Sequence, residues 1–295
     1  MKLHHQHPQH ELQLRDVTLR DGLQNLPEIL STKDKLSILD ALIDAGVKDF
    51  QLTSFVNPAR VPQMTDADVM YAEGVKRGLT PNVLVANLRG FERAVEAGVK
   101  SVDAVLSASN AYNRKNANRT TIESANEIAT MLSRAAHTGC TVGISMANCF
   151  HCFSEGQIDP EIVLALTRSF HDAGARMVWL SDTTGHAKPA AVAKLVESCA
   201  HVGVEVGLHL HDTQGRAGEN AMAGYKVGVR RFDAVLSGLG GSPFTPGVGG
   251  NLSMETAHAV FTAAGIATGL NPVKLEAARA KLSAGIAAGE RIGAA

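Results

Sequence analysis

The stretch TKDKLSILDALIDAGVKDFQLTS, residues 32–54, shows the unit from which this chain is built. Apolar residues recur every three or four positions over residues 32–46, which is the period of an amphipathic helix. That segment ends in Ala-Gly, and a glycine after the last turn commonly ends a helix because it adopts a positive φ without strain. Residues 47–54 then carry the β-branched and aromatic side chains typical of a strand. The stretch therefore predicts a helix that leads directly into a strand.

The same pattern recurs along the chain. Further strands are predicted at residues 12–18, 82–88, 101–108, 141–148, 175–182, 205–211 and 231–238, which makes eight in all. Helical segments are predicted between them at residues 90–98, 122–139, 160–174 and 189–203. Eight strand–helix units in about 250 residues favour an α/β fold of the (β/α)8 TIM-barrel type over an open doubly wound sheet. A doubly wound sheet would want G-x-G-x-x-G after the first strand, where this chain has TLRDGLQN.

No shift in composition divides the 295 residues into two parts. We therefore expect a flexible N-terminal tail over residues 1–11 and one TIM-barrel domain over residues 12–295. The histidines at positions 4, 5, 7 and 10 fit a solvated tail better than a metal site, because they lie in a polar, Pro-containing terminus. Residues 272–295 are rich in alanine and predict a helical extension and tail at the C-terminus.

Composition and charge exclude several classes of protein. The net charge of −1 gives no electrostatic reason to bind nucleic acid or a membrane surface. No apolar stretch approaches the ~18 residues of a membrane span, and the N-terminus lacks the apolar run of a signal peptide. Four cysteines in a chain of this length do not resemble a disulfide framework, and the pair in CFHC (149–152) is read as two reduced thiols, because half a zinc site is weak evidence for zinc. We expect a soluble, cytoplasmic protein.

Polar side chains gather where the predicted strands end. In TIM barrels the reacting groups lie at the C-terminal ends of the strands. Here those ends carry Arg20, Asp21, Gln51, Thr53, Ser54, Asn87, Ser107, Ser109, Asn148, Asp182, His209, His211 and Asp212. So many polar groups at one end of a barrel are hard to explain by packing and predict a functional site there.

The segment HLHDTQG (209–215) is the most informative of these ends. Residues two apart in a strand point to the same side, so His209 and His211 can offer two nitrogens to one ion. Asp21 brings a carboxylate to the same end of the barrel. Two imidazoles, a carboxylate and further oxygen donors suit a divalent cation that keeps positions open for substrate, with Mg²⁺, Mn²⁺ and Zn²⁺ all conceivable.

Motifs spread over nearly the whole chain resemble those of the 3-hydroxy-3-methylglutaryl-CoA (HMG-CoA) lyase family, which are metal-dependent TIM-barrel lyases. The matching segments are RDGLQN (20–25), TSFVNPARVPQMTDAD (53–68), NLRGFERAVEAGVK (87–100), RKNANRTTIES (114–124), SDTTG (181–185), HLHDTQG and GLGGSPFTPGVGGN (238–251). The resemblance implies a metal held by Asp21, His209, His211 and Asn251, with Mg²⁺ or Mn²⁺ expected and Zn²⁺ as an alternative.

The resemblance also implies roles in catalysis for Arg20, Gln51, Asp182, His209 and Ser242. Arg20 would polarise the substrate carbonyl and stabilise the enolate. Asp182 would handle a proton, although capping of the next helix is an alternative role for it.

Two of these positions depart from the lyases. Ser242 stands where the lyases have the cysteine of a GGCP motif, and a hydroxyl is a much weaker acid than a thiol. Gln51 replaces a glutamate with a neutral side chain of similar shape.

The leading hypothesis is a metal-dependent carbon–carbon lyase that cleaves a 3-hydroxyacyl-CoA, either HMG-CoA or a related 3-hydroxy-3-alkyl acyl-CoA. Arg114, Lys115 and Arg119 are predicted to hold the CoA phosphates, although a solvated loop is an equally open interpretation of that segment. One alternative is a 4-hydroxy-2-oxo acid aldolase without CoA, because DVTLRDG (16–22) has the Thr-Leu typical of aldolases and synthases of the wider group. Another is a catalytically impaired paralogue that acts as a binding subunit. A homo-oligomer is expected in each case.

Overall fold

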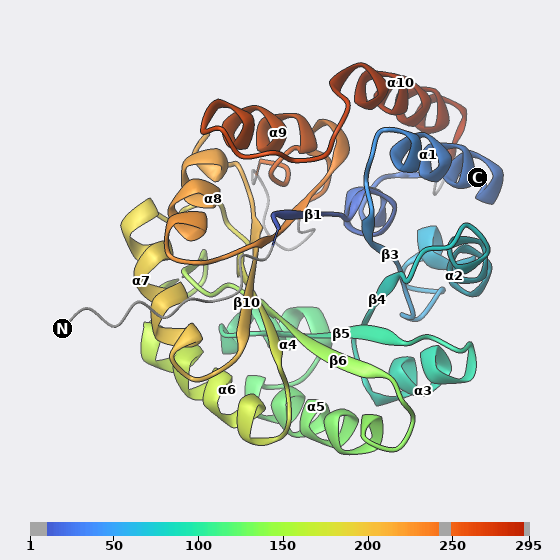
Figure 1. Ribbon diagram of the computed structural model, residues 1–295. Helices are drawn as coiled ribbons and strands as arrows, with labels where there is room; N and C mark the ends of the chain where they lie inside the picture. The colour runs from blue at the N-terminus through green and yellow to red at the C-terminus, as the bar shows by residue number, and fades with distance from the viewer. Residues whose placement is uncertain (1–10, 242–248, 292–295) are drawn as a thin grey trace.

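The computed structural model describes residues 11–241 and 249–291. Its centre is a closed barrel of eight parallel strands, surrounded by a ring of helices (Figure 1). Around the barrel the strands follow the order β1-β11-β10-β9-β6-β5-β4-β3. Their bounds are β1 Gln13–Asp16, β3 Asp49–Ser54, β4 Asn82–Val85, β5 Ser101–Ser107, β6 Thr141–Ala147, β9 Met177–Asp182, β10 Glu205–Leu210 and β11 Arg231–Ala234. The predicted TIM barrel and all eight predicted strands are confirmed.

Each strand is followed by one helix of the outer ring. These helices are α1 Thr32–Asp44, α2 Ala67–Lys76, α3 Leu88–Glu96, α5 Thr121–Ala135, α6 Pro160–Asp172, α7 Pro189–Ala200, α8 Ala217–Lys226 and α9 Met254–Ala263. The five helices predicted from periodicity are confirmed within a few residues, whereas α2, α8 and α9 were not predicted. In α2 the pattern is interrupted by Gly74, which lets the helix pack close to β3, since a Cβ there would lie 2.7 Å from the Leu52 side chain.

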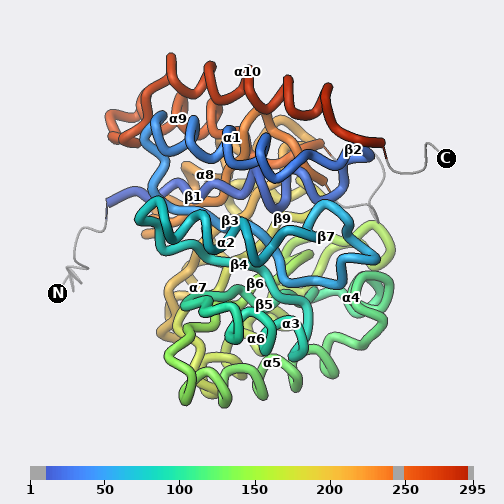
Figure 2. Tube along the Cα trace, turned by 90° about the vertical axis from the view of Figure 1, so that its right-hand side faces the viewer, coloured from blue at the N-terminus to red at the C-terminus, as the bar shows by residue number. Residues whose placement is uncertain are grey.

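The predicted C-terminal helix is also confirmed. It is α10, Pro272–Ala288, and it packs against α1 on the outside of the ring (Figures 1 and 2). The short strand β12, Glu290–Arg291, then pairs antiparallel with β2, Glu28–Ile29. Residues 290–291 are therefore hydrogen-bonded to the segment that precedes α1.

The first predicted strand is shorter than expected, because β1 ends at Asp16 and a π-helix, η1, covers Thr18–Gly22. The Asp16 carboxylate accepts hydrogen bonds from the Thr18 backbone N–H at 3.0 Å and from the Thr18 hydroxyl at 2.7 Å. Such a side-chain turn competes with continued strand pairing. It places Arg20 and Asp21 on a helical turn at the end of the barrel rather than on a strand.

Two insertions lie at the same end of the barrel. The segment considered as a loop after β5 contains a helix, α4, Asn110–Ala117, which begins where the Ser109 hydroxyl accepts a hydrogen bond from the Tyr112 N–H. Between β6 and α6 the chain forms the small hairpin of β7, His151–Cys152, and β8, Gly156–Gln157. No described helix is long and apolar enough to cross a membrane.

The inside of the barrel is partly charged. Arg15, Gln51, Asp103 and Asp233 point inward, and none of them is more than 4% exposed. The Arg15 guanidinium contacts both carboxylates, at 2.6 Å from Asp103 and 2.7 Å from Asp233, and lies 3.6 Å from the ring centre of Trp179. A buried charge is tolerated only when it is paired and hydrogen-bonded, and these contacts provide that pairing.

Candidate active site and metal centre

Three potential metal ligands meet at the C-terminal end of the barrel. Asp21 comes from η1, His209 from β10, and His211 directly follows β10. One ligand atom from each of the three lies within 4.8 Å of the others, and His209 Nε2 is 3.8 Å from Asp21 Oδ2. Within residues 11–241 and 249–291, this is the one group of three or more such side chains that could hold a metal ion. The structure therefore brings together three of the four predicted ligands from distant parts of the sequence.

Asn251, the fourth predicted ligand, lies beside the other three. A backbone bridge pairs it antiparallel with His211. Its Nδ2 donates hydrogen bonds to Asp21 Oδ2 at 2.6 Å and to the Leu239 carbonyl at 2.9 Å, and its backbone N–H donates to the same carbonyl at 3.3 Å. The two ends of the segment from Leu239 to Asn251 are thus held together.

The Oδ1 atom of Asn251 tests whether a metal fits this site. It is buried and has no hydrogen-bond partner in the described part of the chain, although the amide nitrogen donates two hydrogen bonds. A buried acceptor without a partner is costly unless a ligand satisfies it. Amide and carboxylate oxygens with two imidazoles suit a Mn²⁺ or Mg²⁺ ion that keeps further positions open. The donor set therefore fits a divalent cation.

Both imidazoles use Nδ1 for a contact inside the protein. His209 Nδ1 lies 2.9 Å from Asp233 Oδ2, and His211 Nδ1 lies 3.3 Å from the Gly249 carbonyl oxygen. Each contact leaves Nε2 for the group of ligand atoms. Histidines that bind metals are usually held in this way through the other ring nitrogen.

The charge states suit metal binding. Burial alone would raise the pKa of Asp21, but Arg20 and the two histidines hold that pKa at about 2. Burial, together with the neighbouring His209, lowers the pKa of His211 to about 4. Near neutral pH the carboxylate is therefore ionised and the His211 imidazole is neutral, which are the forms that bind a cation.

Arg20 lies next to the four predicted ligands. Its side chain is buried, at 6% exposure for the residue, and its Nη1 forms an ion pair with Asp21. Its Nε has no hydrogen-bond partner among the residues that the structure describes. An arginine with a free donor near a cation site can bind an additional anionic or carbonyl oxygen.

Asp182, at the end of β9, has contacts that agree with both interpretations of its role. Its Oδ1 accepts from the His186 N–H at 3.1 Å and its Oδ2 from the Ala187 N–H at 2.9 Å, which ties down the loop before α7. The expected structural role was capping of the next helix. Asp182 instead holds the loop before that helix, because α7 begins after Lys188. Burial nevertheless raises the pKa of Asp182 to about 6, which is suited to proton transfer near neutrality.

The remaining predicted residues lie apart from the ligand group. Gln51 is inside the barrel, and its Nε2 donates to Asp103 Oδ2 at 2.8 Å and to Asn82 Oδ1 at 3.1 Å. Arg114 and Lys115 are exposed on the last turn of α4, and Arg119 forms an ion pair with Glu127 at the start of α5. Ser242 lies outside the described residues.

Sequence reasoning missed Asp233, which contacts His209. One signal was present, since RFDAVLSG (231–238) places a single acidic residue between the apolar residues Phe232 and Ala234. Such a residue in a buried strand usually has a charged partner.

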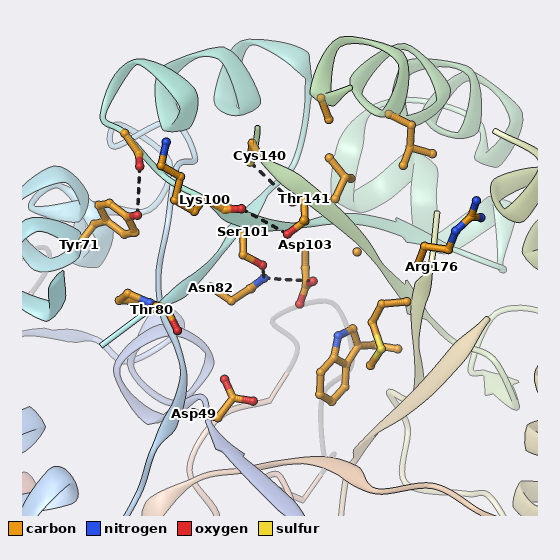
Figure 3. Close-up of a pocket in the computed structure, with 18 of the residues that line it drawn as sticks. Asp49, Tyr71, Thr80, Asn82, Lys100, Ser101, Asp103, Cys140, Thr141 and Arg176 are labelled. Atoms are coloured by element: carbon orange, nitrogen blue, oxygen red, sulfur yellow. Dashed lines mark hydrogen bonds between the residues drawn. The ribbon is translucent and has the colours of Figure 1, made fainter. Parts of the chain in front are cut away.

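A cavity of about 1150 Å³ lies at the other, N-terminal end of the barrel (Figure 3). Its lining includes Asp49, Asn82 and Ser101, which begin three strands, and it reaches Asp103 and Arg15 in the interior. In Figure 3 a hydrogen bond joins Asn82 to Asp103. This cavity is on the opposite side of the interior charges from the metal ligands, so it is separate from the candidate site.

Known proteins with the same fold include close relatives. The family model described as HMGL-like matches residues 11–281. The (R)-citramalyl-CoA lyase of Chloroflexus aurantiacus is 39% identical over 91% of this chain and 89% of its own length. The human mitochondrial hydroxymethylglutaryl-CoA lyase is 34% identical over 88% of this chain and 81% of its own length.

A solved structure also covers nearly the whole chain. It is the HMG-CoA lyase of Acinetobacter baumannii in complex with coenzyme A and 3-methylmalate. The two structures superpose with a TM-score of 0.88 at 31% sequence identity, and the match covers 94% of this chain and 92% of the A. baumannii chain. Divalent-metal dependence is a trait of this family, which agrees with the ligand group described above. With a family model that matches almost the whole chain, and relatives that share its barrel, this chain belongs to the HMGL-like family and is a carbon–carbon lyase.

Proposed function

We propose that the protein cleaves a 3-hydroxyacyl-CoA that carries a tertiary hydroxyl and a carboxylate, with a divalent cation held by Asp21, His209, His211 and Asn251. The observation that carries the proposal is the convergence of these four side chains beside Arg20 at the C-terminal end of the barrel. The relatives are lyases for HMG-CoA and (R)-citramalyl-CoA, and both compounds have these groups. Cleavage of the first gives acetyl-CoA and acetoacetate, and cleavage of the second gives acetyl-CoA and pyruvate.

The reaction needs a proton to leave the hydroxyl and another to reach the new acetyl carbon. A bound Mg²⁺ or Mn²⁺ would act as a Lewis acid that lowers the pKa of the substrate hydroxyl. Asp182 accepts the hydroxyl proton, consistent with a pKa raised to about 6 by burial. The electrons of the broken carbon–carbon bond move into the thioester, and the Arg20 guanidinium stabilises the enolate oxygen, with Nε as a donor that no described protein group uses.

Ser242 takes the position that delivers the second proton in the lyases. A serine hydroxyl is a poor acid, so we assign Ser242 to hold a water or a substrate oxygen that passes the proton on. Arg114 and Lys115 are exposed on α4 and free to reach the CoA phosphates, whereas Arg119 would first have to leave Glu127. Assembly into a homo-oligomer, a cytoplasmic location, the flexible tail over residues 1–11 and a single domain over residues 12–295 stay predictions.

A direct assay tests the proposed function. Metal-free protein is supplied with Mg²⁺ or Mn²⁺ and given HMG-CoA, (R)-citramalyl-CoA and longer 3-alkyl analogues, and acetyl-CoA and the oxo acid are measured. Cleavage of at least one acyl-CoA is expected, and it should disappear when the metal is removed. Absence of cleavage with every acyl-CoA, in protein that binds the metal, would contradict the proposal.

The same assay separates the alternatives. Release of pyruvate from a free 4-hydroxy-2-oxo acid, without any acyl-CoA cleavage, would identify the aldolase. A chain that binds acyl-CoA but cleaves neither class of substrate would be the impaired paralogue. Ser242→Cys refines that last case, because restored HMG-CoA cleavage would show that the remaining catalytic groups are intact.

A further inference from the structure

The charged row inside the barrel is set by strand register. Arg15 of β1 is the direct neighbour of Asp233 in β11, and Asp233 is the direct neighbour of His209 in β10. Neighbours in a parallel sheet point to the same face, so all three side chains enter the interior side by side. The row therefore links the middle of the barrel to a predicted metal ligand.

Hydrogen bonds connect the three residues, and Asp233 is the acceptor in each of them. Arg15 Nε donates to Asp233 Oδ1 at 2.7 Å, and Arg15 Nη2 donates to Asp233 Oδ2 at 3.1 Å. Two parallel bonds of this kind fix the plane of a carboxylate as well as its position. The carboxylate can only accept hydrogen bonds, so the His209 nitrogen 2.9 Å away must be the donor.

The geometry points to Asp233, held by Arg15, as the positioning residue that fixes His209 with its proton on Nδ1 and its lone pair on Nε2, directed at the ion. A neutral imidazole carries one N–H, so a hydrogen bond from Nδ1 leaves Nε2 free to coordinate. Asp233 would act through His209, since a cation would be held on the far side of the ring, where Nε2 is 3.8 Å from Asp21 Oδ2. The inference rests on the metal site proposed above.

Asp103 provides a matched control for Asp233. The two carboxylates are buried to a similar degree, 2% and 4% exposed, and both form ion pairs with Arg15. Asp103 receives its other hydrogen bonds from Gln51 and Asn82, on the side of the barrel away from His209. Neutralising either carboxylate removes the same charge from the same arginine. Only the change at Asp233 also removes the hydrogen-bond acceptor for His209.

The test compares Asp233→Asn with Asp103→Asn, using Mn²⁺ alone as the probe and titration calorimetry without substrate. Loss of a carboxylate that orients a metal-binding histidine typically weakens metal affinity by about 10–100-fold, and we expect this for Asp233→Asn. The affinity of Asp103→Asn should stay close to that of the wild type. Equal loss in both variants would overturn the inference, because it would show a general effect of removing a buried charge.

A second measurement does not depend on the folding of the Asp233 variants. Histidine labelled with ¹⁵N in the metal-free wild type shows which ring nitrogen of His209 carries the proton, and the signal is assigned by its absence in His209→Gln. The proton is expected on Nδ1, and a proton on Nε2 alone would overturn the inference. If Asp233→Asn does not fold, Asp233→Glu keeps the charge but shifts the acceptor by one methylene, and it should weaken Mn²⁺ binding.

The outcomes also separate this inference from the proposed reaction. Wild-type protein that binds no Mn²⁺ would overturn both the metal site and the role of Asp233 in it. Wild-type protein that binds Mn²⁺ in the expected way but cleaves no acyl-CoA would contradict only the proposed reaction, because affinity and proton position are measured without substrate.

Discussion

Arg15 and Arg20 lie on the same short segment of chain, one inside the barrel and one at its C-terminal end, and both are almost fully buried. Arg15 is saturated: it forms ion pairs with Asp103 and Asp233, and its guanidinium stacks on Trp179. Among residues 11–241 and 249–291, Arg20 forms an ion pair with Asp21 alone, and its Nε has no hydrogen-bond partner. A buried donor without a partner costs about 1–3 kcal/mol in a protein that binds nothing at that point.

The difference separates two uses of the same side chain. In the interior the donors of Arg15 are matched by acceptors on neighbouring strands, so its charge maintains the fold. At the end of the barrel, Arg20 Nε and Asn251 Oδ1 have no hydrogen-bond partner among the described residues, and both side chains contact Asp21. The contrast holds for the two arginines rather than for the whole interior, because Gln51 Oε1 is also buried without a partner among these residues. Unpaired atoms on both sides of Asp21 favour this end of the barrel as the place where a ligand binds.

The largest loss of stability is expected from Arg15→Met. It leaves Asp103 and Asp233 buried without their cation, and breaking a buried pair from one side typically costs about 3–5 kcal/mol. Unfolding in urea, followed by circular dichroism, measures the change in the free energy of unfolding. Arg231→Met is the control, because Arg231 pairs with Glu205 at the surface, where such a pair contributes at most about 1 kcal/mol. Similar losses of unfolding free energy in Arg15→Met and Arg231→Met would contradict the structural role of Arg15.

Arg20→Met should instead affect the reaction. Removing a donor that stabilises charge in the transition state typically lowers kcat about 10²–10³-fold. The measurement is kcat at saturating Mn²⁺ and substrate, together with the free energy of unfolding, which should fall less than in Arg15→Met. Unchanged turnover combined with a large loss of stability would show that Arg20 is as structural as Arg15.

The variant Gln51→Glu tests the hydrogen bonds in the barrel interior. The resemblance to lyases with a glutamate at this position suggests a gain in activity, but the contacts of Gln51 suggest otherwise. The introduced carboxylate would replace the amide that donates to Asp103 at 2.8 Å, so two negative charges would meet, and we expect a loss of about 1–3 kcal/mol in stability. Gln51→Met, which removes the amide without adding a charge, serves as the control. The difference in the free energy of unfolding between Gln51→Glu and Gln51→Met should become smaller at low pH. A Gln51→Glu variant that is more stable than the wild type would contradict the prediction.

Near pH 4, the smallest change in the free energy of unfolding is expected from Asp16→Asn. Burial raises the pKa of Asp16 to about 7, with the hydrogen bonds from Thr18 opposing that rise. Since the folded protein holds this proton more tightly than the unfolded chain does, Asp16 lowers stability as the pH rises from about 4 towards 7. The asparagine Oδ1 can still accept from the Thr18 backbone N–H, and its Nδ2, like the protonated acid, would donate to the Thr18 hydroxyl instead of accepting from it. The variant should therefore match the wild type near pH 4 and become the more stable protein by pH 8. Parallel pH profiles of the unfolding free energy would contradict this.

The sequence predicts the fold because the signals for it are local. Each strand is a short run, and most helices end at a glycine that can be seen without knowledge of its neighbours. Helices α2 and α8 escaped detection because Gly74 and Gly224 interrupt their patterns, and both glycines reflect close packing on β3 and β10 that only the tertiary structure reveals. The same limit hid α4, whose polar sequence shows little amphipathic contrast.

The site was predictable only where a motif carries its own chemistry. His209 and His211 are two residues apart in one predicted strand, and Asp21 comes shortly after the first strand, so their convergence could be expected. Asp233 could not be paired with His209 from the sequence, because the partner of a lone acidic residue depends on strand register. The interior position of Gln51 likewise depends on Asp103 and Asn82, which come from two other strands.

The joined ends of the segment from Leu239 to Asn251 have a consequence for how such enzymes diverge. Because the Leu239 carbonyl binds both nitrogens of Asn251, the position of this residue is fixed at the base of the segment. Gly240 and Gly250 lie against this base, since a Cβ at Gly240 would be 2.4 Å from Asn251 Nδ2 and one at Gly250 would be 1.4 Å from the Gly238 carbonyl oxygen. A larger residue at either glycine would therefore displace the base. A relative that acts on a different acyl group is expected to keep both glycines, with Asn251 beside Asp21, and to change at other positions.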